Sequence, residues 1–221
     1  MNERARAEEH LRIIRSLMER ATIYRAISAP TALVGGLLAV VTAAVIWFET
    51  AAPAEGASVM ITNRLFAEIW LVILAVVLAL NAYFVWREAQ RGGRPFFSSG
   101  ARLAMRAIAP CLLLPAATTV WYFKNAEPID QEILVAVWIA FYGLSLLATA
   151  LFAPRSLVLL GWAFLLSGLV LIFWPKSFGD DPRGLLPNLE MGATFGLYHL
   201  VYAACVWGRK EPEVREILPS E

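Results

Sequence analysis

The chain has 221 residues and a formal net charge of +1, and 59% of its residues are hydrophobic while only 17% are charged. Soluble domains contain roughly 45–50% apolar residues, so this composition argues against a soluble globular fold and predicts a membrane protein. The small net charge by itself indicates no class of partner.

The first 29 residues carry an amphipathic pattern. From Leu11 onward apolar side chains recur at helical spacing, while charged side chains take the opposite face. The pattern predicts an amphipathic interfacial helix that lies in the inner headgroup layer of a membrane. We expect this arm to contact anionic lipid headgroups or a cytoplasmic protein partner. The residues expected to make that contact are Arg12, Arg15, Glu19, Arg20 and Arg25.

Six apolar segments follow, each near the length of about 20 residues that an α-helix needs to cross hydrocarbon. They are residues 30–48, 65–86, 103–123, 133–153, 156–174 and 189–207. None alternates like a barrel strand, so the sequence predicts an all-α, six-transmembrane-helix bundle. The predicted organisation is a cytoplasmic arm (1–29), a transmembrane domain (30–208) and a cytoplasmic tail (209–221).

The cations are distributed unevenly between the gaps. Of the 19 Lys and Arg residues, all but four lie in the arm, in the tail, or in and beside every second gap. The four exceptions are Arg64, Lys124, Lys176 and Arg183. Because cation-rich segments resist translocation, this pattern predicts a multi-pass bacterial inner-membrane protein with both termini in the cytoplasm.

Ala-Pro pairs lie near the beginnings of the first, third and fifth segments. They are Ala29-Pro30, Ala109-Pro110 and Ala153-Pro154. One interpretation is three related helical hairpins; the other is the general preference of proline for the first helical turn. In the third segment Pro110 and Pro115 remove backbone hydrogen-bond donors, so we expect that helix to bend.

The last segment is the most polar in its middle. Gly192 and Gly196 have the GxxxG spacing that lets a neighbouring helix approach closely, and His199 falls on the same predicted face. His199 lies near the midpoint of the segment, where an ionisable side chain is costly in lipid. Tyr198 and Tyr202 flank it.

Two interpretations of His199 follow. In one, His199 is part of a proton or substrate path, because an imidazole changes charge near neutral pH. In the other, which we favour, His199 is neutral and hydrogen-bonded to a neighbouring helix. A proton path normally includes several buried acids, whereas Glu68, Glu132 and Glu190 all lie near the outer ends of their segments.

Motifs for soluble-type catalysis do not occur in the chain: it has no Ser-His-Asp order, P-loop or GxGxxG sequence. The histidines His10 and His199 and the two cysteines have no metal-ligand spacing. We therefore expect no cofactor, no metal, no nucleic-acid partner and no enzymatic activity. Within the enzyme class, the alternative is chemistry on membrane lipids near Glu68, Glu132 or Glu190.

Two short motifs carry a resemblance. They are LRIIRSLMERAT at residues 11–22 and FGLYHLVY at residues 195–202. Together they resemble a family of uncharacterised bacterial six-helix inner-membrane proteins with a similar arm and a similar last helix. The resemblance implies six helices and a shared importance of Arg15, Glu19, Arg20, His199 and Tyr202, and it implies no activity.

The leading functional hypothesis is a non-enzymatic membrane protein that anchors or regulates partners or forms part of a complex. Its partner is expected to be a membrane protein, a cytoplasmic protein or a second copy of the chain. The alternative hypothesis is a small-molecule or ion transporter with a site near His199 and Tyr202.

Overall fold

The computed structural model describes residues 8–12, 29–51, 62–91, 99–125, 130–151, 153–173 and 185–207. Every secondary-structure element within these ranges is a helix, which confirms the all-α prediction. Residues 8–12 of the predicted arm are helical. The rest of the arm, with Arg15, Glu19, Arg20 and Arg25, and the predicted tail lie outside the described residues.

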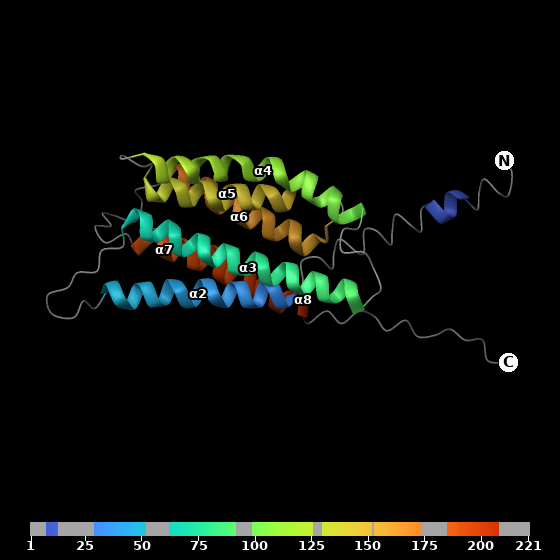
Figure 1. Cartoon of the computed structure of the whole chain (residues 1–221), viewed down its shortest axis with the longest axis horizontal. Coiled ribbons are helices and arrows are strands. Elements are labelled where there is room, and N and C mark those ends of the chain that lie inside the picture. The colour runs from blue at the N-terminus through green and yellow to red at the C-terminus, as the bar shows by residue number, and fades with distance from the viewer. Residues whose placement is uncertain are drawn as a thin grey trace.

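The six predicted segments form the helices of a bundle. They are α2 (Ala29–Ala51), α3 (Asn63–Arg91), α4 (Ser99–Lys124), α5 (Gln131–Leu147), α6 (Arg155–Phe173) and a last helix built from α7 (Leu185–Met191), η1 (Gly192–Tyr198) and α8 (His199–Trp207). Successive helices run in alternate directions along the long axis of the molecule (Figure 1). Five of the six are long and apolar enough to cross a membrane, and α5 is shorter.

The alternation separates charges to the two ends of the bundle. The arginine end, where α3 and α5 stop and α4 and α6 start, carries exposed side chains of Arg87, Arg91, Arg102, Arg106 and Arg155. The opposite end is called the acidic end here. It carries Glu49, Glu68, Asp130, Glu132 and Glu190, together with the cations Arg64 and Lys124.

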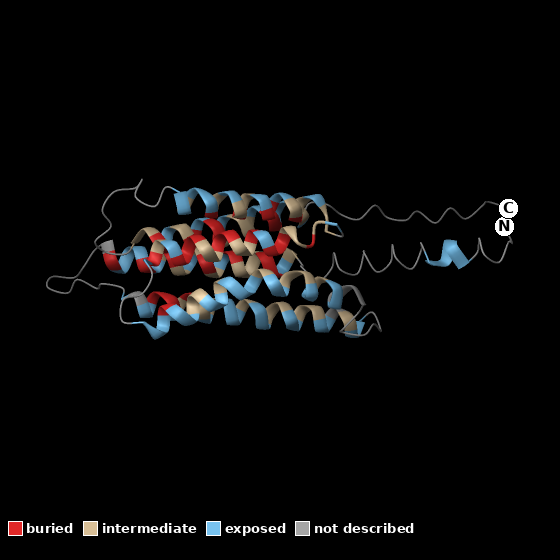
Figure 2. Ribbon diagram, turned by 90° about the horizontal axis from the view of Figure 1, so that it is seen from above, coloured by how far each residue is buried: buried red, intermediate tan, exposed pale blue. Residues whose placement is uncertain are grey.

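The core lies between α2, α5, α6 and the last helix. α5 packs along α6, and α2 packs along α7, η1 and α8. Figure 2 shows the buried residues gathered in the middle of the bundle, with exposed residues along its outer helices. Phe66, Leu134, Ile139 and Phe164 are among the largest side chains that are fully buried.

Glycines set the separation of α5 and α6. A Cβ atom on Gly143 would lie 2.4 Å from the Leu165 nitrogen, and a Cβ on Gly168 would lie 2.5 Å from the Ala140 nitrogen. Both contacts are with backbone atoms, which cannot rotate away as a side chain can. Small residues of this kind allow helix backbones to approach within van der Waals distance in apolar surroundings.

α3 and α4 are peripheral helices. α3 buries Phe66, Ala67 and Trp70 near the acidic end, and none of its described side chains from residue 71 to 91 is buried. Along the described part of α4, Tyr122 is the single buried side chain. Both helices therefore present most of their apolar surface outward, which suits a lipid environment.

α4 is bent, as the two prolines predict (Figure 1). Pro115 has no backbone N–H, and the hydroxyl of Thr119 donates a hydrogen bond of 2.6 Å to the Pro115 carbonyl. Thr119 in turn accepts a hydrogen bond of 2.9 Å from the indole nitrogen of Trp138. The irregular part of α4 is thus tied to α5 through one hydroxyl.

The helix of the fourth predicted segment, 133–153, lies closer to the N-terminus than the sequence predicts, at Gln131–Leu147. α5 ends at Leu147, where the backbone N–H groups of Thr149 and Ala150 donate to carbonyls three residues back instead of four. This tightening closes the helix ahead of Pro154, whose ring disfavours helical geometry in the residue before it. The hydroxyl of Thr149 also donates to the Leu146 carbonyl, at 2.7 Å.

The Ala-Pro pairs do not occupy equivalent positions. Ala29 begins α2 and Pro154 directly precedes α6, but Ala109-Pro110 lies ten residues inside α4, which begins at Ser99. The middle pair therefore lies well inside its helix and not in the first turn. Pro110 bends a helix, whereas the other two prolines lie where a helix starts.

Candidate functional site

The last helix changes its winding at Gly192. Residues Gly192–Tyr198 form a π-helical segment between the α-helical turns of α7 and α8. Because π-helices are rare and are commonly found where a side chain must be placed for function, this segment marks the candidate site. A uniform α-helix over 189–207, as the sequence predicts, is wrong in this middle part.

The two glycines of the π-helix face α2. A Cβ on Gly192 would lie 2.5 Å from the Ala43 Cβ, and a Cβ on Gly196 would lie 2.6 Å from the Val40 Cγ2. From the other side, a Cβ on Gly36 would lie 3.0 Å from the Gly196 carbonyl oxygen. The predicted GxxxG contact is confirmed, and its partner is the first helix of the bundle.

His199, one turn further along, makes a different contact. Its Nε2 atom lies 2.8 Å from the Tyr142 hydroxyl on α5, and its Nδ1 atom lies 2.9 Å from the Phe195 carbonyl oxygen. The prediction that His199 lies at a helix contact is confirmed. Its hydrogen-bond partner lies on α5, whereas Gly192 and Gly196 contact α2.

These two bonds define the state of the imidazole. A carbonyl oxygen can only accept, so Nδ1 carries a proton and donates to Phe195. In a neutral ring Nε2 is then the acceptor, and the Tyr142 hydroxyl donates to it. Both ring nitrogens are occupied, so His199 offers no lone pair to a metal ion unless its bond with Tyr142 breaks.

The imidazole of His199 bonds to a carbonyl that a backbone N–H would use in a regular α-helix. In a regular α-helix the backbone N–H of His199 would donate to the Phe195 carbonyl. Here that N–H donates to the Gly196 carbonyl instead, and the imidazole reaches back to Phe195. The side chain of His199 thus stabilises the altered winding of its own helix.

An aromatic cluster surrounds His199, and we call it the His199 cluster. Its members are Tyr142, Phe164, Phe195, Tyr198 and His199. Phe164 is fully buried at its centre, with ring centroids 4.7 Å from Tyr142, 5.0 Å from Phe195 and 5.4 Å from both Tyr198 and His199. Offset and edge-on rings at such distances contribute about 0.5–1.5 kcal/mol per pair beyond their buried area.

A second polar bond ties the cluster to α6. The hydroxyls of Tyr198 and Ser167 lie 2.8 Å apart, and the Ser167 hydroxyl also donates to the Ala163 carbonyl, at 2.8 Å. Its proton is therefore committed, so Tyr198 is the donor in the bond to Ser167. The site connects the last helix to α5 through His199 and to α6 through Tyr198.

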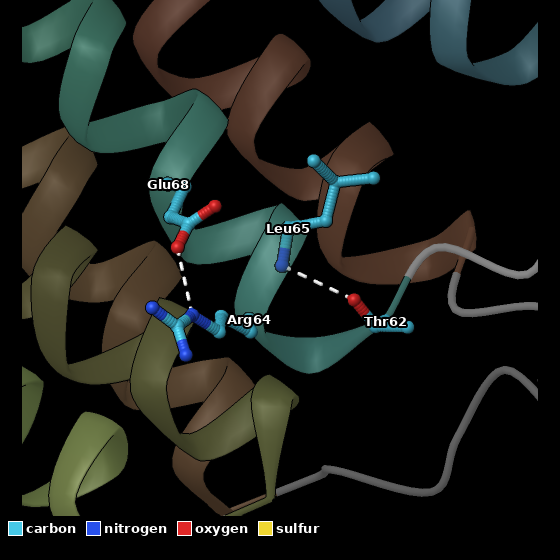
Figure 3. A network of polar contacts seen from close by, with 4 residues as sticks. All are labelled: Thr62, Arg64, Leu65 and Glu68. Carbon is cyan, nitrogen blue, oxygen red and sulfur yellow. Dashed lines mark hydrogen bonds and ion pairs between the residues drawn. The ribbon is translucent and has the colours of Figure 1, made fainter.

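The remaining predicted site residues are placed in two groups. Tyr202 is buried in the core on α8. Glu68 and Glu190 lie at the acidic end, and the structure does not bring them to the His199 cluster. Glu68 accepts from the Arg64 guanidinium at 2.8 Å on the exposed side of α3, while Thr62 caps the beginning of that helix (Figure 3).

The sequence did not predict the partners of His199 and Tyr198. Tyr142, Phe164 and Ser167 complete the site, yet nothing in their own segments distinguishes them from ordinary packing residues. It also missed the bond in which the Trp70 indole donates to the buried Asn188 side chain, at 3.1 Å. Asn188 lies just outside the predicted segment 189–207, so the sequence did not predict that it is buried.

Comparison with models of known protein families, with curated proteins and with solved structures finds no match for this chain. The resemblance to a family of bacterial six-helix proteins stays a prediction.

Proposed function

We propose that this chain is a multi-pass protein of a bacterial inner membrane, with both termini in the cytoplasm. Two observations support this location: the outward apolar surfaces of α3 and α4, and the five exposed arginines at one end of the bundle. Under the positive-inside rule the arginine end faces the cytoplasm.

Single cysteines test the orientation. In a chain whose Cys111 and Cys205 have been replaced by serine, we expect Lys124→Cys to react with a membrane-impermeant maleimide in intact spheroplasts. Arg91→Cys is expected to react only after permeabilisation, because it lies at the opposite end of the bundle. The reverse labelling pattern would overturn the orientation.

We propose that the protein acts as a non-enzymatic anchoring or complex-forming subunit. One observation carries this proposal. His199 and Tyr198 are hydrogen-bonded to neighbouring groups, and both are surrounded by packed aromatic rings. A transport path needs polar groups that can exchange partners with water or substrate. Groups that join three helices instead suit a rigid platform that presents its arm and its outer helices to a partner.

Native mass spectrometry of the tagged protein released gently from its own membranes tests the role. We expect a second protein at fixed stoichiometry, lost when residues 1–25 are deleted while the chain stays in the membrane fraction. Deletion of residues 210–221, on the same predicted side, is the control and should retain the partner. Unchanged recovery without residues 1–25 would contradict the proposed role of the arm.

Transport is the second candidate, favoured by the coincidence of a π-helix with the one histidine of the described bundle. The same spectra distinguish the two. A lone chain or homo-oligomer that retains a small molecule, and loses it on His199→Ala, would support transport or ligand binding over anchoring.

A further inference from the structure

We infer that the inner turns of α4 form a binding site for an anionic phospholipid, with the lipid phosphate on Arg102 and Arg106 and an acyl chain along the outward face of the same helix. The inference rests on the proposed membrane location. To that location it adds a bound ligand, an anionic phospholipid, and the residues that contact it.

The first step is the geometry of the two arginines. Arg102 and Arg106 are four residues apart on α4, so they lie on one face with their Cβ atoms about 6 Å apart. Both side chains are exposed. Two planar guanidinium groups at this spacing can donate to the oxygens of one phosphate, which is the geometry that arginine favours.

The second step is the charge balance. No Asp or Glu occurs between residues 98 and 110, so no acid lies within one helical turn of either arginine. Neither arginine forms an ion pair with any described residue, whereas Arg64 at the acidic end is paired with Glu68. Like charges four residues apart repel each other, and a bound anion would relieve that repulsion.

The third step is the surface that continues from the arginines toward the middle of the bundle. At 100° per residue, Ala109 falls within about 20° of the direction of Arg102. Beyond the bend at Pro110, α4 continues to expose apolar side chains, among them Leu113 and Val120. All three are exposed, and Leu113 is 70% exposed. These exposed apolar side chains suit contact with an acyl chain whose headgroup lies on the arginines.

The experiment compares the binding of two lipids, and it compares substitutions at the two ends of α4. The full chain is purified in a neutral detergent, and binding of phosphatidylglycerol and of phosphatidylcholine is measured by native mass spectrometry. We expect preferential binding of phosphatidylglycerol, weakened about fivefold by Arg106→Gln and about 25-fold by Arg102→Gln with Arg106→Gln, since each arginine near a membrane surface contributes about 1 kcal/mol. Arg106→Lys should fall between wild type and Arg106→Gln.

Lys124→Gln is the matched control, because it removes one exposed cation from the other end of α4. Wild-type binding in the double variant, or equal weakening by Lys124→Gln, would overturn the site. Equal displacement of the lipid by soluble glycerol phosphate would also overturn it, because the site would then recognise free phosphate. Failure of the membrane location would appear separately, as a wild-type chain that alkaline carbonate extracts from membranes.

Discussion

Replacing Gly143 by alanine is expected to lower the free energy of unfolding by about 3 kcal/mol, because its Cβ would make the shortest contact among the described glycines. The added Cβ would lie 2.4 Å from the Leu165 nitrogen and 2.6 Å from the Gly161 carbonyl oxygen. Because both atoms belong to the α6 backbone, relief requires α5 and α6 to separate. That separation would loosen the helix pair that holds Tyr142 and Phe164.

Gly35→Ala is the control for Gly143→Ala. Its Cβ would meet only the Val77 side chain, at 3.2 Å, which can move by a few tenths of an ångström. Alanine is also the better helix former, by roughly 1 kcal/mol, so the unfolding free energy should stay near the wild-type value. Reversible unfolding in mixed micelles, followed by tryptophan fluorescence, measures both. Equal destabilisation by the two variants would show that general helix crowding, and not the α5 contact with α6, governs stability.

His199→Phe is expected to cost about 2 kcal/mol of unfolding free energy. Phenylalanine fits among the rings of the His199 cluster, but it leaves the Tyr142 hydroxyl without its acceptor and removes the bond to the Phe195 carbonyl. Tyr142→Phe leaves the opposite group, the His199 Nε2 lone pair, without its donor.

A double-mutant cycle isolates the pair. With both residues replaced by phenylalanine, neither unpaired group remains, so the double variant should be more stable than the sum of the single effects by about 1–2 kcal/mol. Ser167→Ala, which removes the neighbouring bond to Tyr198, is the control and should add independently to His199→Phe. Additive losses for Tyr142 and His199 would mean that their hydrogen bond contributes nothing to stability.

The sequence predicted the helices well because an apolar segment near 20 residues long has few alternatives to a helix. It also predicted the close approach at Gly192 and Gly196, since GxxxG spacing exposes backbone on one helix face. It did not predict α2 as the partner, because a motif on one helix carries no information about which neighbour receives it.

The π-helix and the pairing of His199 with Tyr142 could not be predicted from the sequence, for a related reason. Both depend on how α5, α6 and the last helix are rotated against one another, and side-chain periodicity is compatible with many rotations. The early end of α5 was nearer to being predictable. Pro154 indicates that a helix ends before it. The mostly apolar residues from Ala148 to Ala153, however, look like a continuation of the helix and not like a turn.

The pairing of α2 with the last helix has a consequence for biogenesis. Synthesis proceeds from the N-terminus, so α2 is made before the other helices of the bundle. Its surface around Gly36, Ala39 and Ala43 nevertheless packs against the last helix, at Gly192, Gly196 and Leu200. Until the last helix is made, that small-residue surface lacks the helix that covers it. A chain that stops before Gly192 keeps the contacts of α2 with α3 and α7 but lacks those with η1 and α8, so part of the small-residue surface of α2 stays uncovered.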